Sequence, residues 1–101
     1  MEENMQEKLE EIAMMIIANS GQARSDAFAA LQEAKKGNWE LVEPRIKEGE
    51  QFYRQAHEQH GEILLKEVTQ VSILLCHAQD HLMGSALALD LIREMIVLYQ
   101  K

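Results

Sequence analysis

Residues 71–100 read VSILLCHAQDHLMGSALALDLIREMIVLYQ and form the most apolar part of this 101-residue chain. The composition predicts one long helix, from about Val71 to about Gln100, with apolar residues at nearly every angle around its axis. A helix that is apolar on all sides is covered on all sides. Two partner helices in the same chain can cover only part of it. We therefore expect copies of the chain to meet along this helix.

Two further helices are predicted before it, because strong helix formers dominate and the chain has only five glycines and one proline. In residues 3–36 the apolar positions recur in steps of three and four, which is one helical face. Residues 39–66 repeat this pattern, with Pro44 in the second turn, where it can bend the helix. Gly37 separates the two and suits the left-handed position after a helix end. No segment alternates with period two, so we predict an all-α fold.

The short connections, one of them near residues 68–70, predict an antiparallel, up-down-up three-helix bundle. The length fits a single domain that spans residues 1–101. A domain of this size buries a limited share of its surface when it folds alone. A homo-oligomer with the third helix at its interface would bury more.

The net charge of −7 argues against a nucleic-acid partner, because no basic patch stands out to neutralise phosphates. The single cysteine, Cys76, cannot form an internal disulfide and fits a reducing compartment. The N-terminal residues MEENMQEKLEE are acidic, unlike a secretory signal or a transit peptide. No run approaches the roughly 20 apolar residues that cross a bilayer. We expect a cytoplasmic protein with no direct membrane insertion.

His77, Asp80 and His81 lie inside the apolar segment, where burying them without partners would cost several kcal/mol. On a helix His77 and His81 are four residues apart and can meet, while Asp80 points about 60° away from His77. This spacing leaves four interpretations open. The residues could bind a metal, perform acid–base catalysis with His77 and Asp80, or include a nucleophilic histidine that carries a group covalently. They could also be core histidines that are satisfied by hydrogen bonds.

A second histidine pair, His57 and His60, lies on the second predicted helix. Residues three apart share a helical face, so this pair could hold a metal. The same spacing fits a solvated polar face on which both rings are unliganded.

The segment HAQDHLM at residues 77–83, near the start of the third long helix, resembles the lactose/cellobiose-specific IIA component of the bacterial phosphotransferase system. Residues 18–38, ANSGQARSDAFAALQEAKKGN, look like the first helix of that family. Residues 56–57 look like part of its second helix, and residues 91–92 and 98–99 like parts of its C-terminal helix. The resemblance covers essentially the whole chain.

The resemblance implies a cytoplasmic homotrimer of three-helix subunits that carries phosphoryl groups. His77 would accept the group from the phosphohistidine of HPr, on the tele nitrogen or alternatively on the pros nitrogen. The group would pass to a cysteine of the IIB component and then to a sugar that the membrane IIC component brings in. That sugar would be a β-linked disaccharide of the cellobiose, lactose or chitobiose type. The candidate residues that would support the phosphohistidine are His81, Gln79, His57 and His60.

The resemblance also implies that Asp80 from three subunits meets on the three-fold axis around one divalent cation, magnesium or a similar ion. Three carboxylates held together in a dry core would repel one another. A hard cation with oxygen ligands removes that repulsion. Asp80 is thus interpreted as a structural metal ligand.

Two other functions compete with the phosphoryl carrier. The first is a non-enzymatic helical interaction module that uses the acidic bundle only for docking. The second is a metal-dependent hydrolase built on His77, Asp80, His81 and a histidine of the second helix. A phosphate that is present on the native protein and absent from His77→Ala would favour the carrier. One tightly bound zinc or iron ion per chain would favour the hydrolase.

Overall fold

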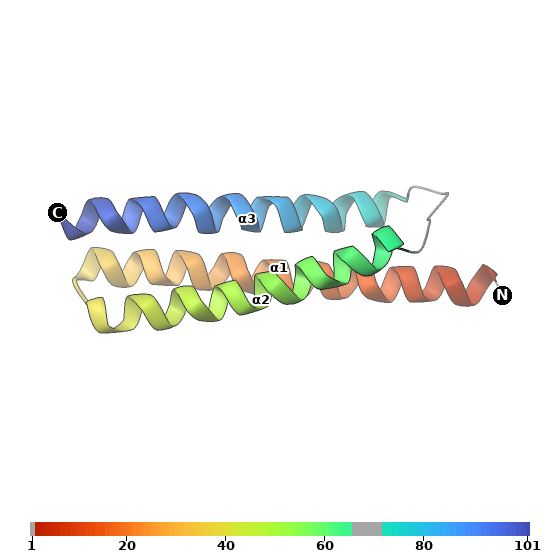
Figure 1. Ribbon diagram of the computed structural model, residues 1–101, viewed down its shortest axis with the longest axis horizontal. Helices are drawn as coiled ribbons and strands as arrows, with labels where there is room; N and C mark the ends of the chain where they lie inside the picture. The colour runs from red at the N-terminus through yellow and green to blue at the C-terminus, as the bar shows by residue number, and fades with distance from the viewer. Residues whose placement is uncertain (1, 66–71) are drawn as a thin grey trace.

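The computed structural model describes residues 2–65 and 72–101, which contain three helices. These are α1 (Glu2–Lys36), α2 (Trp39–Leu65) and α3 (Ile73–Gln100) (Figure 1). The described residues contain no strand, which confirms the all-α prediction. The predicted connection near residues 68–70, the predicted end of the second helix at Lys66 and the predicted start of the third at Val71 lie outside the described residues.

The three helices lie side by side along a rod that measures 56 × 18 × 17 Å. α1 and α3 run in the same direction and α2 runs in the opposite one, which confirms the up-down-up order (Figure 1). α2 and α3 each pack mainly against α1 and have little contact with each other. α1 is therefore the central helix, and one side of α3 faces away from the bundle.

The turn between α1 and α2 depends on Gly37, whose φ of 81° lies in the left-handed region. The Gly37 N–H donates to the carbonyl of Ala34 at 3.1 Å, and the Asn38 N–H donates to the carbonyl of Glu33 at 2.9 Å. These bonds satisfy the last carbonyls of α1, as a left-handed residue after a helix end allows. The predicted role of Gly37 is confirmed.

Small residues on α1 form the middle of the core. One buried cluster joins them to α2 and α3 in the C-terminal half of α1; its members are Ala23, Ala27, Ala30, Ala34, Val42, Ile46, Leu89, Ile92 and Ile96. A second cluster lies nearer the start of α3; its members are Ile12, Ala13, Ile16, Ala56, Ala78 and Leu82. Alanines at steps of three and four leave room for both neighbouring helices to approach α1 closely.

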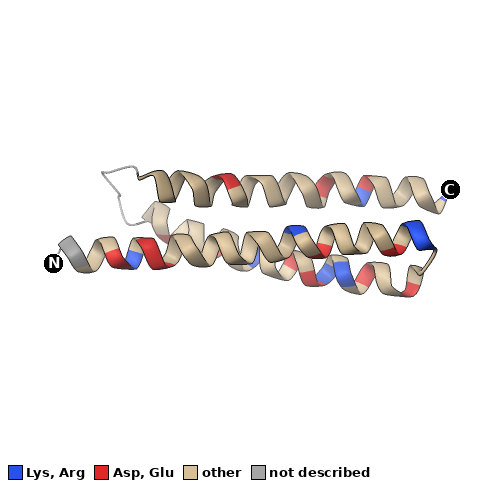
Figure 2. Ribbon diagram, turned by 180° about the vertical axis from the view of Figure 1, so that it is seen from behind, with Lys and Arg blue, Asp and Glu red and all other residues tan. Residues whose placement is uncertain are grey.

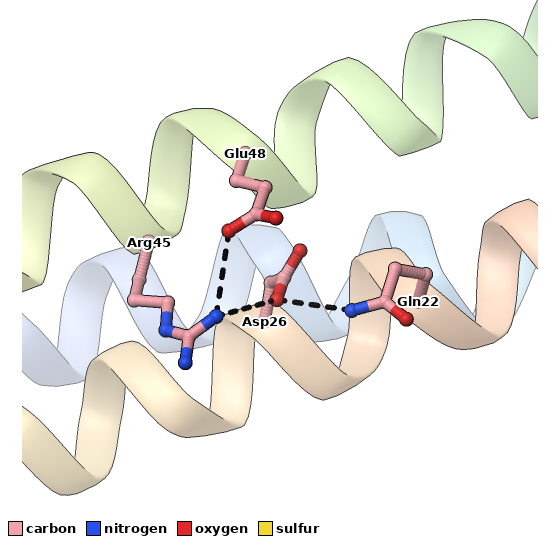
Figure 3. Close-up of polar contacts among 4 residues, drawn as sticks. All are labelled: Gln22, Asp26, Arg45 and Glu48. Carbon is pink, nitrogen blue, oxygen red and sulfur yellow. Dashed lines mark hydrogen bonds and ion pairs between the residues drawn. The ribbon is translucent and has the colours of Figure 1, made fainter.

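A buried carboxylate and a glycine join α1 to α2. Asp26 is only 2% exposed, and its Oδ1 accepts from Gln22 Nε2 at 3.1 Å and from Arg45 Nη1 at 3.3 Å (Figure 3). A Cβ at Gly49 would lie 3.0 Å from the carbonyl oxygen of Ala23 and 3.2 Å from the Cβ of Asp26. Gly49 thus permits the close approach of α2 to α1 at this point.

α3 keeps an exposed apolar surface, which we call the α3 stripe and define as Leu87, Leu91, Met95 and Leu98. Leu87 is 60% exposed and Leu98 is 68% exposed, so the other two helices cover only part of α3, as predicted. Charged residues are sparse along α3 in comparison with α1 and α2 (Figure 2). Within residues 2–65 and 72–101, no helix is both long enough and apolar enough to cross a membrane.

Candidate functional site

The start of α3 is defined by Ser72, one turn before His77. Ser72 has extended backbone angles, with φ −108° and ψ 158°, and its Oγ accepts from the Leu75 N–H at 3.0 Å. A serine in this position satisfies one of the free N–H groups of the first turn. The Cys76 N–H then donates to the carbonyl of Ser72 at 3.1 Å. His77 is thereby placed on a regular helix rather than on a connecting segment.

His77 and His81 contact each other through their ring nitrogens. Their Nε2 atoms lie 3.2 Å apart, and the two rings meet edge to face with centroids separated by 4.6 Å. One ring donates from Nε2 and the other accepts, and the tautomers decide which ring does which. His77 is exposed, whereas His81 is half-buried. A partner can therefore reach the His77 ring, while His81 lies behind it.

Both histidines border a groove of about 490 Å³ between α1 and α3. Its lining residues are Ser20, Arg24, Phe28, His77, Asp80, His81, Gly84, Ser85, Leu87, Ala88 and Leu91. The groove is polar near the start of α3, and two members of the α3 stripe make its other end apolar. The structure thus brings the three residues of the predicted site, His77, Asp80 and His81, to one surface feature.

Asp80 is exposed and provides one carboxylate to the groove. The described part of the chain contains no group of three or more His, Cys, Asp or Glu side chains that could hold a metal ion. One chain therefore offers the predicted magnesium ion a single suitable ligand. The predicted site takes its three carboxylates from three copies of the chain, and water can complete the coordination of a magnesium ion.

The other predicted supporting residues lie outside the groove lining. Gln79 is exposed on α3. On α2, His57 is exposed, with its ring 5.9 Å from that of Tyr53, and His60 is half-buried. Within one chain the structure does not bring these three side chains to the groove. Their role in stabilising a phosphohistidine stays a prediction, and His57 and His60 could fill it from an adjacent subunit.

Sequence reasoning missed the α1 side of the groove. Arg24 is the single lysine or arginine among the described residues that line it, and its guanidinium lies 5.7 Å from the centre of the Phe28 ring. Ser20 is 1% exposed, and its hydroxyl has no hydrogen-bond partner among the described residues. Both residues belong to the segment whose likeness to the family's first helix was noted, but the sequence pattern assigned them no role.

Comparisons with known proteins point to one family. The family model described as "PTS system, Lactose/Cellobiose specific IIA subunit" matches residues 11–100. The N,N'-diacetylchitobiose-specific EIIA component of Escherichia coli is 41% identical over 99 residues, which cover 94% of this chain and 85% of that protein. The lichenan-specific phosphotransferase enzyme IIA component of Bacillus subtilis is 34% identical over 101 residues, which cover 96% of this chain and 92% of that protein.

Solved structures show the same relationship. The PTS cellobiose-specific enzyme IIA of Bacillus anthracis superposes with a TM-score of 0.86 and 38% identity, covering 91% of this chain and 88% of that chain. A chain in the IIA(Chitobiose)–HPr complex of Escherichia coli superposes with a TM-score of 0.81 and 40% identity, covering 91% of this chain and 93% of that chain. With the family model and the curated relatives in agreement, the chain belongs to the lactose/cellobiose-specific IIA subunits of the phosphotransferase system and is a phosphotransfer component.

Proposed function

We propose that this chain is a phosphoryl carrier that accepts the group from phospho-HPr on His77 and passes it to a IIB component. The observation that carries this proposal is the exposed His77 ring, held on α3 with its Nε2 3.2 Å from the Nε2 of His81. An exposed neutral imidazole can act as a nucleophile without an additional base. Further support comes from the related IIA that has been solved in complex with HPr.

In the accepting step, Nε2 of His77 forms a bond to phosphorus while the nitrogen–phosphorus bond of the donor phosphohistidine breaks. The electron pair of that broken bond stays on the departing imidazole. Little other covalent chemistry is required, so the carrier contributes mainly position and charge stabilisation. His81 is the donor closest at hand, because its Nε2 already lies within hydrogen-bond distance of the reacting atom. In the second step a cysteine thiolate of IIB displaces His77 from phosphorus.

We also propose that the working form is a homotrimer in which the α3 stripe of each subunit is covered by its neighbours. The stripe and Asp80 lie along the same side of α3, because their positions recur in steps of three and four. Burying an exposed leucine contributes about 1.5–3 kcal/mol. Assembly through this side would bring three Asp80 carboxylates together while His77 stays at the edge of the interface.

A magnesium ion, or a similar divalent cation, would be held by Asp80 from three subunits. Carboxylate oxygen is the donor that such hard cations prefer, and the ion would offset the repulsion among three charges. The proposal predicts about one ion per three chains. Equilibrium dialysis should show this stoichiometry for the native protein and its loss in Asp80→Asn, with phosphorylation retained in the variant.

The transported sugar is proposed to be a β-linked disaccharide of the chitobiose, cellobiose or lactose type, as the names of the relatives suggest. The carrier would act in the cytoplasm as a single domain and reach the IIC component only through IIB. None of the groove residues is assigned to sugar binding, because the carrier handles only the phosphoryl group.

The test is incubation with phospho-HPr followed by mass spectrometry of the intact protein. The native chain should gain one acid-labile phosphate, and both His77→Ala and His77→Gln should gain none. Cys76→Ser is the matched control, because it changes the neighbouring exposed nucleophile and should leave the phosphate in place. A phosphate that persists in the His77 variants would overturn the assignment.

The two competing functions have less support. The hydrolase requires a histidine of α2 beside His77, Asp80 and His81, and neither His57 nor His60 lines their groove. The interaction module gives no reason for two histidines in contact with each other on an apolar helix. The carrier accounts for that pair directly.

A further inference from the structure

We propose that His77 and His81 together form a bidentate site for a divalent transition-metal ion of the Ni²⁺ or Zn²⁺ type. This site differs in position, ligand chemistry and stoichiometry from the proposed magnesium site of Asp80. Its occupancy would place a metal ion on the same nitrogen that is proposed to accept the phosphoryl group.

The geometry of the pair fits one shared ion. Metal–imidazole bonds of about 2.0–2.1 Å, at angles between about 90° and 110°, place the two nitrogens about 2.9–3.4 Å apart. The observed separation of the Nε2 atoms is 3.2 Å, so both rings can ligate one ion with little movement. The i, i+4 spacing on α3 holds both rings on one helical face before any ion arrives.

Binding needs no net loss of protons from a neutral pair. The ring that carries its hydrogen on Nε2 must move it to Nδ1, so that both Nε2 lone pairs face the ion. Because His77 is exposed, water can occupy the remaining coordination positions. Asp80 points about 60° from His77, away from the side on which His81 lies, and is not required as a ligand.

The ligand set selects the type of ion. Imidazole nitrogen suits nickel, copper and zinc, whereas magnesium prefers oxygen ligands. We therefore expect Ni²⁺ and Zn²⁺ to bind the pair and Mg²⁺ to leave it untouched. The α2 pair is a built-in comparison, because His57 and His60 are three residues apart rather than four and the His57 ring lies beside that of Tyr53.

The consequence for activity rests on the proposed function. An ion on Nε2 of His77 removes the lone pair that would attack phosphorus, so metal binding and phosphorylation exclude each other. Metal binding itself does not depend on that function and can be measured alone.

The experiment is isothermal titration calorimetry of the untagged protein with NiCl₂, with ZnCl₂ as a second probe and MgCl₂ as the hard-ion control. We expect one Ni²⁺ per chain, with binding weakened at least about tenfold in His77→Ala and in His81→Ala. The double variant His57→Ala/His60→Ala should bind as the native protein does. Equal Ni²⁺ affinity in the native protein and both α3 variants would overturn the proposal.

A second measurement does not depend on variants folding correctly. In ¹⁵N-labelled native protein, Zn²⁺ should shift the Nε2 resonances of two histidines and leave the other two unchanged. Shifts of all four histidines, or of none, would contradict the site. Phosphorylation of the native protein should slow in the presence of Ni²⁺ and recover when EDTA removes the ion. If phosphate reaches His77 at an unchanged rate in Ni²⁺-loaded protein, metal binding and phosphorylation do not exclude each other. The carrier function would still stand in that case.

Discussion

Arg45 Nη1 lies 3.3 Å from Asp26 Oδ1, and this ion pair joins a half-exposed guanidinium on α2 to a carboxylate that is 2% exposed on α1. The second oxygen of the same carboxylate, Oδ2, is buried without a hydrogen-bond partner among the described residues. The pair therefore leaves part of the charge of Asp26 uncompensated. Burial raises the pKa of Asp26 above 3.8, and nearby Glu48 adds to the rise, while the Gln22 hydrogen bond and Arg45 oppose it.

The raised pKa makes stability depend on pH in a definite direction. The folded protein holds the Asp26 proton more tightly than the unfolded chain does, so stability falls as pH rises from about 3.8 through the raised pKa. Above the raised pKa, Asp26 is charged in both the folded and the unfolded chain, so stability falls no further on its account. Asp26→Asn should remove this dependence and, at neutral pH, match or exceed native stability by up to about 1 kcal/mol. Urea unfolding at fixed protein concentration between pH 4 and 8 measures both effects.

Asp26→Asn keeps an oxygen that can accept from Arg45 and replaces the unpartnered oxygen with an uncharged group. If the difference in unfolding free energy between the native protein and the variant stays constant across this pH range, Asp26 does not cause the pH dependence of stability. Arg45→Gln is the companion variant. It removes a partner that lowers the pKa of Asp26 and should therefore steepen the pH dependence.

Gly49 and Gly61 should respond oppositely to alanine. At Gly49 the new Cβ would meet the Ala23 carbonyl oxygen at 3.0 Å and the Asp26 Cβ at 3.2 Å, so α2 would have to move away from α1. We expect Gly49→Ala to destabilise the protein by about 1–3 kcal/mol. At Gly61 no described atom outside the adjacent backbone of its own helix lies within 4 Å of the added Cβ, and Gly61→Ala should stabilise by about 0.5–1 kcal/mol. Thermal unfolding of the two variants checks this, and equal shifts would contradict the close approach at Gly49.

Leu87→Lys should separate the proposed trimer into single chains. The side chain is 60% exposed in one chain, so the substitution costs the isolated subunit little, but in an assembly it buries three ammonium groups near one another. Leu41→Lys on α2 is the control, because Leu41 is 48% exposed and belongs to a different helix from the α3 stripe. Light scattering after size exclusion reports the mass of each. If Leu87→Lys still forms an assembly of native mass, the interface between subunits does not include the α3 stripe.

His81→Ala should still be phosphorylated on His77 but should lose phosphate faster. A hydrogen bond to a charged group contributes about 1.5–3 kcal/mol, which corresponds to roughly tenfold or more in the hydrolysis rate of the phosphohistidine. The lifetime can be followed by ³¹P NMR after removal of the donor. Gln79→Ala provides the comparison, because Gln79 lies outside the groove lining. A shorter lifetime in Gln79→Ala than in His81→Ala would transfer the supporting role to Gln79.

Much of the fold follows from residue periodicity alone. The steps of three and four in residues 3–36 and the glycine at position 37 predict α1 and its end correctly, because both signals are local. The predicted start of the third helix at Val71 falls outside the described residues, and the signal that was overlooked is Ser72, a serine directly before a long apolar run. The uncovered side of α3 could also be foreseen, since an apolar helix needs more neighbours than two.

The α1 side of the site could not be predicted in the same way. Periodicity shows which face of a helix is apolar but not which helix lies in the middle, so nothing in the pattern placed Arg24 in one groove with His77 and His81. The burial of Asp26 is a similar case. A charged residue within an apolar line is usually expected to reach solvent, and the sequence does not show that α2 comes close to this one at Gly49.

Because α2 and α3 have little contact with each other, most of the packing that connects the α2 surface to His77 runs through α1. We expect substitutions on the outward side of α2 to leave the His77–His81 contact in place. A substitution on the buried side of α1 affects the packing of both α2 and α3. The outer surface of α2 can therefore be altered with little effect on the packing around the histidine pair of α3.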